Sequence, residues 1–335
     1  MGEDPAEEKK ASKRKPPRLF PDSVDEFIEL YAKPKNRGWA ETRRLLKQNA
    51  EPHLKYLTLE EITRHHVIDV LDAVIARGAP TQANRTLAAI RKLFNWSLDR
   101  GLIDHNPVTG LKPPAKEVSR DRVLTDQEIK KVWAAWDQIG WPFGPLFKLL
   151  LVTGQRRSEV ASMKWTDISD GIWTIPREIA KNDRTHDVPL TPLALDILDG
   201  LPRHARTQLI FTMNGRNPVS GFGKLKEKTD EQSGVTDWRL HDLRRTAASG
   251  MARLGVAPHI VEKILNHSSG VISGVAAVYN RHGYESEKRS ALELWDTHLA
   301  ELCTGRGNRI VEVDTKDVHR PEGSHRMGGA MEVQR

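Results

Sequence analysis

The hydrophobic and polar residues of the chain follow a helical spacing over residues 22–111. In four stretches of this region, apolar residues recur three and four positions apart, which is the spacing of one face of an amphipathic helix. The stretches are SVDEFIELYA, ETRRLLKQNAEPHLKYL, LTLEEITRHHVIDVLDAVIARG and TQANRTLAAIRKLFNWSLDRGLI. Gly78 and Gly101 stand where helices are expected to end. No stretch here predicts a strand, so we expect residues 22–111 to form a compact domain of helices.

The periodicity stops after Asn106 and Pro107. Residues 112–122, KPPAKEVSRDR, contain prolines and charges without a period, and they predict a linker between two domains. The second domain, residues 123–305, is expected to open with a helix at Thr125-Asp126-Gln127-Glu128. This tetrapeptide is a capping box, in which the threonine side chain caps the helix and the glutamate reaches back.

A small β-sheet is predicted inside the second domain. The runs GIWTIP and HDVPLT flank the polar stretch REIAKNDRT, as the two strands of a hairpin flank its tip. A helix from about Pro145 to Val152 precedes this region, and helical spacing returns from Leu240 onward. The prediction is a mainly α chain of two domains, the second being mixed α/β, mostly helical, with a small antiparallel sheet.

Both ends of the chain are polar. Residues 1–21 carry a cluster of cations and predict a basic arm, a linker or simply a solvated tail. Residues 306–335 are polar with scattered glycines, which predicts a disordered tail. The cations of the first segment are Lys9, Lys10, Lys13, Arg14, Lys15 and Arg18.

Composition narrows the class of protein. With 335 residues and 38% hydrophobic content, the chain is long enough for about two packed domains. It contains no apolar run of membrane-spanning length and no signal-peptide pattern. Cys303 is the single cysteine, which excludes a disulfide within the chain and a cysteine-rich zinc site. A cytoplasmic protein is therefore expected, and the net charge of +7 favours a polyanionic partner without identifying it.

Basic motifs recur in order along the second domain and end in a tyrosine. They are TGQRRSE at 153–159, HDLRR at 241–245, LNHSS at 265–269 and VYNRHGY at 278–284. A phosphodiester in its transition state carries negative charge on its non-bridging oxygens, and guanidinium groups match those oxygens through paired hydrogen bonds. The ordered set therefore suggests a site that cuts phosphodiesters.

Each residue of this set is weak evidence alone. Arg156 and Glu159 are one helical turn apart, and such a pair is usually a surface ion pair. His241 and Arg244 are spaced to project from one face of a helix toward one ligand. Lys181 lies at the hairpin tip, where an ammonium can reach a phosphate or protonate a leaving oxygen, although most lysines at such tips are only solvated.

A histidine and a tyrosine complete the set. His267 can donate a hydrogen bond to a phosphate oxygen or simply cap a helix. The four tyrosines of the chain are Tyr31, Tyr56, Tyr279 and Tyr284, and the last two follow the basic motifs. A tyrosine assisted by a base or by cations can act as a covalent nucleophile, although a single tyrosine is more often packed or exposed.

In this order, TGQRRSE, the hairpin lysine, HDLR, NHSS and VYNR resemble the catalytic domain of the tyrosine recombinases, the phage integrase family. The resemblance covers residues 123–300, and residues 22–111 resemble the helical core-binding domain of that family, including LFNWSLDRGLIDHNPV at its end. Within the family, the chain is most similar to integrases of temperate or satellite phages and genomic islands.

The resemblance implies a role for each matched residue. Arg156 and Arg244 would clamp the scissile phosphate, and Lys181 would protonate the leaving 5′-oxygen. His241 would transfer a proton, and His267 would donate a hydrogen bond to the phosphate. Two further roles complete the implied site: the supporting acid Glu159 and the nucleophile Tyr279.

The implied reaction is site-specific recombination through a covalent 3′-phosphotyrosine, which integrates or excises a mobile element. It needs no metal ion and no other cofactor. The implied partner is double-stranded DNA with att-type core sites, bound by a homotetramer, with accessory DNA-bending or directionality proteins as further partners.

The chain departs from the family pattern in two places. Tyr279 lies twelve residues beyond His267, farther than in many members, which leaves Tyr284 as the alternative nucleophile. Integrases of this type generally carry a further N-terminal domain that binds arm-type DNA sites. This chain begins at what resembles the segment after that domain, so we expect a truncated or shortened relative.

Further positions are candidates for contact with DNA or with another protomer. Arg85, Arg91 and Lys92 lie on the polar side of the helix expected over residues 81–99, where a solvated helix face is the alternative. Arg157 is a candidate for packing or for the DNA backbone. The stripe Leu292, Trp295, Leu299 and Leu302 can pack within its own domain or dock onto a neighbouring protomer, and the sequence leaves both open.

Other functions remain as alternatives. A type IB topoisomerase-like nicking-closing enzyme uses much the same groups, and a non-catalytic DNA-binding accessory protein would retain only the binding. A metal-dependent nuclease fits poorly, because the expected acidic cluster is missing and the adjacent His65 and His66 diverge on a helix.

Overall fold

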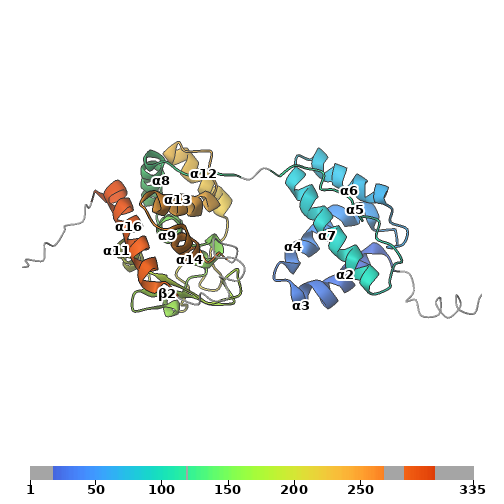
Figure 1. Ribbon diagram of the computed structural model, residues 1–335, viewed down its shortest axis with the longest axis horizontal. Helices are drawn as coiled ribbons and strands as arrows, with labels where there is room; N and C mark the ends of the chain where they lie inside the picture. The colour runs from blue at the N-terminus through green and yellow to red at the C-terminus, as the bar shows by residue number, and fades with distance from the viewer. Residues whose placement is uncertain (1–17, 118–119, 268–282, 306–335) are drawn as a thin grey trace, which may run out of the picture. The chain divides into compact units, whose positions relative to one another are not determined.

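The computed structural model describes residues 18–117, 120–267 and 283–305. The chain forms two compact units that divide between Ser119 and Arg120, and each is described by itself. Helices make up most of both units, and the second also holds a three-stranded antiparallel sheet (Figure 1). The predicted fold class, mainly α with a small sheet in the second domain, is confirmed. Among the described residues, no helix combines the length and the apolar composition that a membrane span requires.

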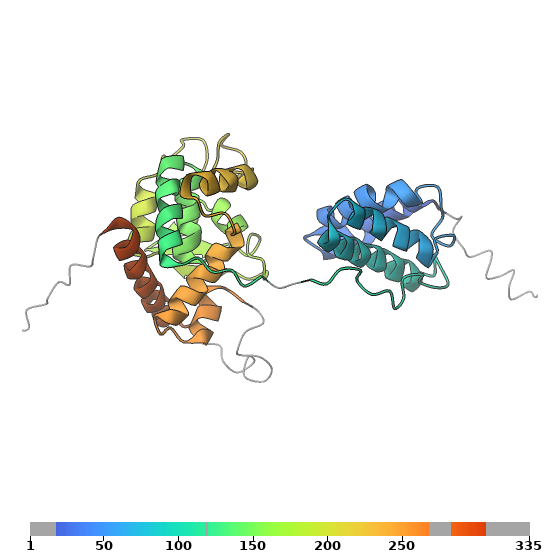
Figure 2. The ribbon, with the colours of Figure 1, turned by 90° about the horizontal axis from the view of Figure 1, so that it is seen from above.

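The first unit consists of helices around one apolar core. Its longest helix, α7, packs along α6 (Figure 2). Buried aromatic rings at Phe20, Phe27 and Phe94 form the centre of this core. The helical segments are α2 (Phe20–Phe27), η1 (Ile28–Ala32), α3 (Lys33–Lys35), α4 (Trp39–Leu45), η2 (Leu46–Ala50), α5 (Glu51–Leu54), α6 (Arg64–Ala76) and α7 (Pro80–Asp99).

Two predicted limits in this unit are wrong. The basic arm was expected to reach residue 21, but α2 already begins at Phe20, because that ring is fully buried and Pro21 suits a first helical turn. The helix expected from Leu57 begins only at Arg64. Thr63 caps it by accepting a hydrogen bond from the His66 amide, and the His66 ring accepts one from the Thr63 amide.

The first part of the predicted linker, residues 112–122, is bound to the first unit, as is the segment just before it. The Arg64 guanidinium donates to the Thr109 carbonyl at 2.5 Å, and the Arg91 guanidinium donates to the Leu111 carbonyl. The Asn84 side chain exchanges two hydrogen bonds with the backbone of Ala115, at 2.8 and 3.0 Å. Residues 107–115 therefore belong to the first unit.

At the start of the second unit, Arg120 and Arg122 form ion pairs with acids of that unit. Arg120 pairs with Asp237 and Asp242, and Arg122 pairs with Glu128. The capping box predicted at Thr125 is confirmed, because the Glu128 amide donates to the threonine hydroxyl at 3.3 Å and the Glu128 carboxylate accepts from the Thr125 amide at 2.9 Å.

The second unit is built around the apolar helix α9, which packs against α8, α11, α13 and α16 (Figure 1). Helix α9 begins two residues before the predicted Pro145. The elements of this unit are α8 (Asp126–Ile139), α9 (Phe143–Thr153), α10 (Arg157–Ala161), η3 (Trp165–Asp167), β1 (Ile168–Ser169), β2 (Ile172–Ile175), β3 (His186–Pro189), α11 (Pro192–Asp199), α12 (Phe222–Ser233), α13 (Leu240–Arg253), α14 (Pro258–Ile264) and α16 (Glu285–Thr304).

The predicted hairpin is present. Strands β2 and β3 are antiparallel, with Ile172 opposite Pro189 and Ile175 opposite His186. The tip between them, residues 176–185, carries Lys181. The third strand, β1, pairs with β2 but spans only two residues, which is too short to leave a pattern in the sequence.

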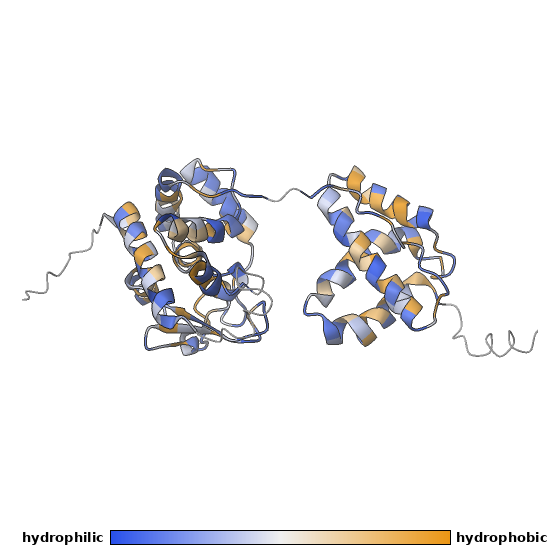
Figure 3. Cartoon of the chain, in the orientation of Figure 1, coloured by the Kyte–Doolittle hydropathy of each residue, from blue (hydrophilic) through white to orange (hydrophobic). Residues whose placement is uncertain are grey.

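Helix α16 packs within its own unit. In Figure 3 it alternates between hydrophobic and hydrophilic positions, and Leu292, Trp295 and Leu299 are buried in the core. The Trp295 indole donates to the Leu151 carbonyl of α9 at 2.9 Å. Gly250 of α13 leaves room for this ring, because a Cβ at Gly250 would lie 2.3 Å from the indole. Leu302 is partly buried against the same core, so the whole stripe packs within its own unit.

Candidate active site

The site begins at the glycine that ends α9. Gly154 has a left-handed backbone, with φ of 65°, which L-residues rarely adopt. A Cβ there would also lie 3.2 Å from the Leu265 side chain. The glycine therefore turns the chain sharply and brings Arg156 to the first turn of α10.

Glu159 holds Arg156 by both backbone and side chain. One carboxylate oxygen accepts from the Arg156 amide at 3.0 Å, and the other accepts from its guanidinium at 3.0 Å. Glu159 is only 1% exposed, so this is not the surface ion pair that the spacing alone favours. The Lys181 amide donates to the same carboxylate at 3.4 Å. Glu159 thus connects the start of α10 with the hairpin tip.

Arg244 lies in the interior beside the same turn. It is 3% exposed, and its guanidinium donates to the Gly154 carbonyl at 2.7 Å and to the Leu265 carbonyl. Burial, followed by the charge of Arg156, lowers the pKa of Arg244 to about 10, so the group remains a cation at neutral pH.

His241 lies one turn before Arg244 on α13 and is exposed. Partial desolvation of the ring, followed by the charges of Arg245 and Arg244, lowers its pKa below the usual range. The next residue, Asp242, is fully buried and caps α13 by accepting from the Arg239 amide at 2.8 Å. Asp242 is not among the predicted site residues, although an acid three residues after the start of a helix is a recognised capping signal.

His267 follows the end of α14 in a Schellman motif. The His267 amide donates to the Glu262 carbonyl and the Asn266 amide to the Lys263 carbonyl, both at 3.1 Å. Asn266 has a φ of 48°, the left-handed conformation that such a motif requires and that asparagine tolerates. The exposed His267 ring lies 2.8 Å from the Glu262 carboxylate.

Polar side chains converge on the carbonyls just before His267. The Arg244 guanidinium donates to Leu265, as described above, and the Arg156 guanidinium donates to Asn266 at 3.2 Å. Three further donors reach this turn: Asn182 donates to the Asn266 carbonyl, and Gln155 and His186 donate to the Ile264 carbonyl, one residue before Leu265. The sequence motifs did not single out any of the three. The sequence held only weak signs of their role. Gln155 is a polar residue inside TGQRRSE, Asn182 is the neighbour of Lys181, and His186 is a buried histidine on strand β3.

Of the two candidate nucleophiles, Tyr284 is the one that the structure describes. Tyr279 lies outside the described residues. Tyr284 precedes α16 and packs against the core of the unit, with its ring edge-to-face on His259 at 5.5 Å and Lys263 over its face at 5.7 Å. Tyr284 therefore has a packing role of its own.

The candidate DNA-contact residues lie in different surroundings. Arg157 is exposed and stacks over the Phe222 ring at 4.9 Å. In the first unit, Arg85 and Lys92 are exposed on α7, and the Lys92 ammonium lies 5.8 Å from the Tyr31 ring. Arg91 is partly buried, and its bond to Leu111 gives it a structural role.

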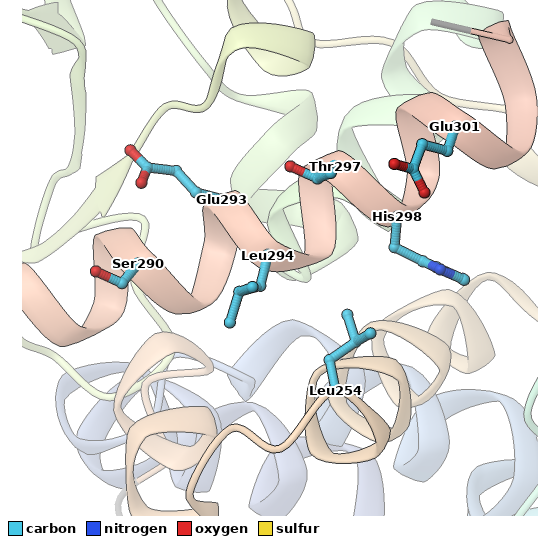
Figure 4. Close-up of a pocket in the computed structure, with 7 residues that line it drawn as sticks. All are labelled: Leu254, Ser290, Glu293, Leu294, Thr297, His298 and Glu301. Carbon is cyan, nitrogen blue, oxygen red and sulfur yellow. The ribbon is translucent and has the colours of Figure 1, made fainter. Parts of the chain in front are cut away.

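A groove elsewhere in the second unit is separate from this site. It lies between α16 and the end of α13, with Leu254 facing Leu294 and His298 (Figure 4). None of the candidate site residues lines it. Among the residues that the structure describes, no group of three or more histidine, cysteine or acidic side chains could hold a metal ion.

Comparison with known proteins covers both units. Residues 122–286 match the phage integrase family, and residues 20–113 match the phage integrase central domain. The prophage integrase IntZ of Escherichia coli (strain K12) is 26% identical over 290 residues, covering 82% of this chain and 70% of IntZ. The prophage integrase IntA of the same strain is 25% identical over 261 residues, covering 75% of this chain and 62% of IntA. The integrase of Enterobacteria phage 434 is 32% identical over 226 residues, covering 64% of this chain and 63% of that protein.

Solved structures share the fold. A lambda integrase dimer bound to a COC′ core site matches with a TM-score of 0.62 and 20% identity, covering 85% of this chain and 83% of that one. A lambda integrase tetramer bound to a Holliday junction matches with a TM-score of 0.63 and 20% identity, covering 82% and 84%. The chain therefore belongs to the phage integrase family of tyrosine recombinases, the tyrosine-type site-specific DNA recombinases.

Proposed function

We propose that this chain cleaves and rejoins DNA strands at a specific site, one strand per protomer, and so integrates or excises a mobile element. The observation that carries the proposal is the convergence of two guanidinium groups, from Arg156 and Arg244, on the turn that leads to His267. Arg244 is buried and donates to two carbonyls, and a buried cation of this kind is costly to the fold and typical of functional sites.

The two arginines would bind the non-bridging oxygens of the scissile phosphate. Each guanidinium has five N–H donors, and those not given to carbonyls or to Glu159 are available for the phosphate. The low exposure of Arg244 strengthens its attraction for the charge that develops in the transition state.

The Tyr279 oxygen would attack the phosphorus atom, forming the 3′-phosphotyrosine bond while the bond to the 5′-oxygen breaks. The lowered pKa of His241 keeps its imidazole neutral at pH 7, so it can accept the tyrosine proton. Lys181 would give a proton to the leaving 5′-oxygen, and His267 would donate a hydrogen bond to the phosphate. Rejoining reverses these steps with the 5′-hydroxyl of the same or of another strand.

Tyr279 is the proposed nucleophile for two reasons. It occupies the VYNR motif, and the alternative Tyr284 is engaged with His259 and Lys263. Glu159 is proposed to support the site by fixing Arg156 and the backbone of Lys181.

The proposed partner is double-stranded DNA carrying att-type core sites, bound by a homotetramer in the cytoplasm. The related lambda integrase has been solved as a dimer on a core site and as a tetramer on a Holliday junction. Exposed cations at Arg85, Lys92 and Arg157 are proposed to contact the DNA backbone. Accessory DNA-bending or directionality proteins remain part of the proposal.

A nicked duplex that carries an att-type core site tests the reaction. A covalent protein–DNA adduct is expected to form, also in the presence of EDTA. Specific binding without an adduct would favour the non-catalytic accessory protein.

Two duplexes that each carry such a core site distinguish the recombinase from the topoisomerase-like alternative. A recombinase exchanges strands between them. An enzyme that only relaxes supercoiled plasmid, with no exchange, would be of the nicking-closing class.

A further inference from the structure

The carbonyls that precede His267 are held by more donors than the two arginines. The Ile264 carbonyl accepts from the Gln155 amide side chain and from the His186 ring, each at 2.9 Å. The Asn266 carbonyl accepts from Arg156 at 3.2 Å and also from the Asn182 side chain. Last-turn carbonyls of a helix have no partner within it, so these donors satisfy groups that would otherwise lack one.

We propose that Gln155, Asn182 and His186 are positioning residues for the cleavage reaction. Through the carbonyls of Ile264 and Asn266, they fix His267 and the Lys181 loop relative to the two arginines. This inference rests on the proposed function, because it concerns the groups assigned there.

The three donors are neutral, and this gives them a role that the arginines cannot fill. The Asn266 carbonyl does not depend on Arg156 alone, because the Asn182 side chain donates to the same oxygen. The Ile264 carbonyl needs neither arginine, because Gln155 and His186 both serve it. The end of α14 therefore stays in place while the arginines engage DNA.

His186 is suited to this role because it stays uncharged. Burial of the ring is the main cause that lowers its pKa to about 4, so the imidazole is neutral at physiological pH. Since a carbonyl can only accept, the bond to Ile264 requires the proton on Nε2. The ring thus has one defined tautomer and one fixed orientation.

Asn182 links two parts of the candidate site. Its neighbour Lys181 is bound through the backbone to Glu159 at 3.4 Å, and the Asn182 side chain is bound to the residue before His267. The hairpin tip is therefore attached at consecutive residues to α10 and to the end of α14. Loss of the Asn182 amide releases the second attachment and leaves the first.

The test measures single-turnover adduct formation on saturating nicked duplex, together with DNA affinity and the thermal midpoint. We expect Asn182→Ala to slow adduct formation by about tenfold, while DNA affinity stays within about twofold and the midpoint is unchanged. Thr185→Ala, an exposed change on the same tip, is the matched control and should keep the wild-type rate.

His186 supplies a second, independent pair of variants. His186→Gln keeps a side-chain N–H for the Ile264 carbonyl, whereas His186→Leu removes it at similar size. Rescue of the rate by glutamine and a loss of about tenfold with leucine support positioning. A wild-type rate for both Asn182→Ala and His186→Leu would overturn it, as would losses of rate and DNA affinity in equal proportion.

A readout without catalysis separates this inference from the proposed function. The imidazole NMR resonances of His267, recorded without DNA, should shift in Asn182→Ala and stay unchanged in Thr185→Ala. If the wild-type chain forms no adduct, the proposed function fails, but the His267 resonances still decide the positioning. Unchanged resonances in Asn182→Ala contradict it whatever the adduct assay shows.

Discussion

The cations of α7 and the two arginines of the second unit differ in burial. Arg85 and Lys92 are exposed, where a charge costs the fold little and contributes little to its stability. Arg244 is almost fully buried, and the Arg156 side chain is 16% exposed. Desolvation of a guanidinium opposes folding unless hydrogen bonds compensate, and here backbone carbonyls supply much of that compensation.

This difference in burial shows which basic residues indicate a function in binding phosphate. An exposed lysine on a helix fits DNA contact and plain solvation equally well. A buried arginine whose partners are mainly carbonyls retains positive charge in a low-dielectric environment, which is the arrangement that stabilises a phosphate. Arg91 is a third case, because its hydrogen bond to the Leu111 carbonyl gives it a role in the fold that requires no DNA contact.

The largest expected effect is at Arg244. Arg244→Ala should slow single-turnover adduct formation by about a hundredfold to a thousandfold, because it removes a fixed donor for the transition-state charge. DNA affinity should change far less, since many contacts contribute to it. Arg253→Ala removes a largely exposed cation from the same helix and serves as the control. Equal adduct rates for the two variants would contradict the claim that the buried arginine, and not the exposed one, takes part in catalysis.

An intermediate effect is expected at His186, whose burial makes the free energy of unfolding depend on pH. Between pH 6.5 and 4, the unfolded chain binds a proton at His186 and the folded chain does not, because burial lowers the folded pKa to about 4. The free energy of unfolding therefore falls as the pH falls through this window, by about 2 kcal/mol from this residue at pH 4.5. In His186→Gln, which has no titrating ring at this position, the loss of stability at pH 4.5 should be smaller by that amount.

Urea unfolding of both proteins at pH 7 and at pH 4.5 measures this difference. The wild-type chain should lose more stability between the two pH values than the glutamine variant. The same loss in both proteins would show that the ring is not held neutral by burial.

The smallest effects are expected on α7. They distinguish a proposed DNA contact, Lys92, from a structural residue, Arg91. Lys92→Ala should weaken DNA binding a few-fold and reduce the slope of log Kd against log salt by about one, with stability unchanged. Arg91→Ala should leave that slope unchanged and lower the free energy of unfolding by about 1 kcal/mol, because the Leu111 carbonyl loses its donor. Salt titration and urea unfolding of both variants check the pair, and the reverse pattern would contradict it.

Local signals in the sequence predicted much of the fold. The capping box at Thr125 and the hairpin around Lys181 follow from residues close together in the chain, and both are present. The start of α6 was misplaced by several residues, because apolar spacing continues upstream of the cap at Thr63. Strand β1 was missed because two residues leave no period.

The candidate site was predictable only in part. Motif order singled out Arg156, Glu159 and Arg244, which the structure brings together, while their chemical roles remain predictions. The partners of the two arginines were not predictable, because every residue has a carbonyl and only the fold decides which one a donor reaches. Asn266 had a readable signal, since an asparagine after the last helical turn favours the left-handed cap.

The most direct test of the central claim is to map the covalent bond. Adduct formed on the nicked duplex is digested with trypsin, and the peptide that retains the nucleotide is sequenced by mass spectrometry. We expect a phosphotyrosyl bond at Tyr279, no adduct in Tyr279→Phe and an adduct that is retained in Tyr284→Phe. A bond at Tyr284, or an adduct that persists in Tyr279→Phe, would contradict the account.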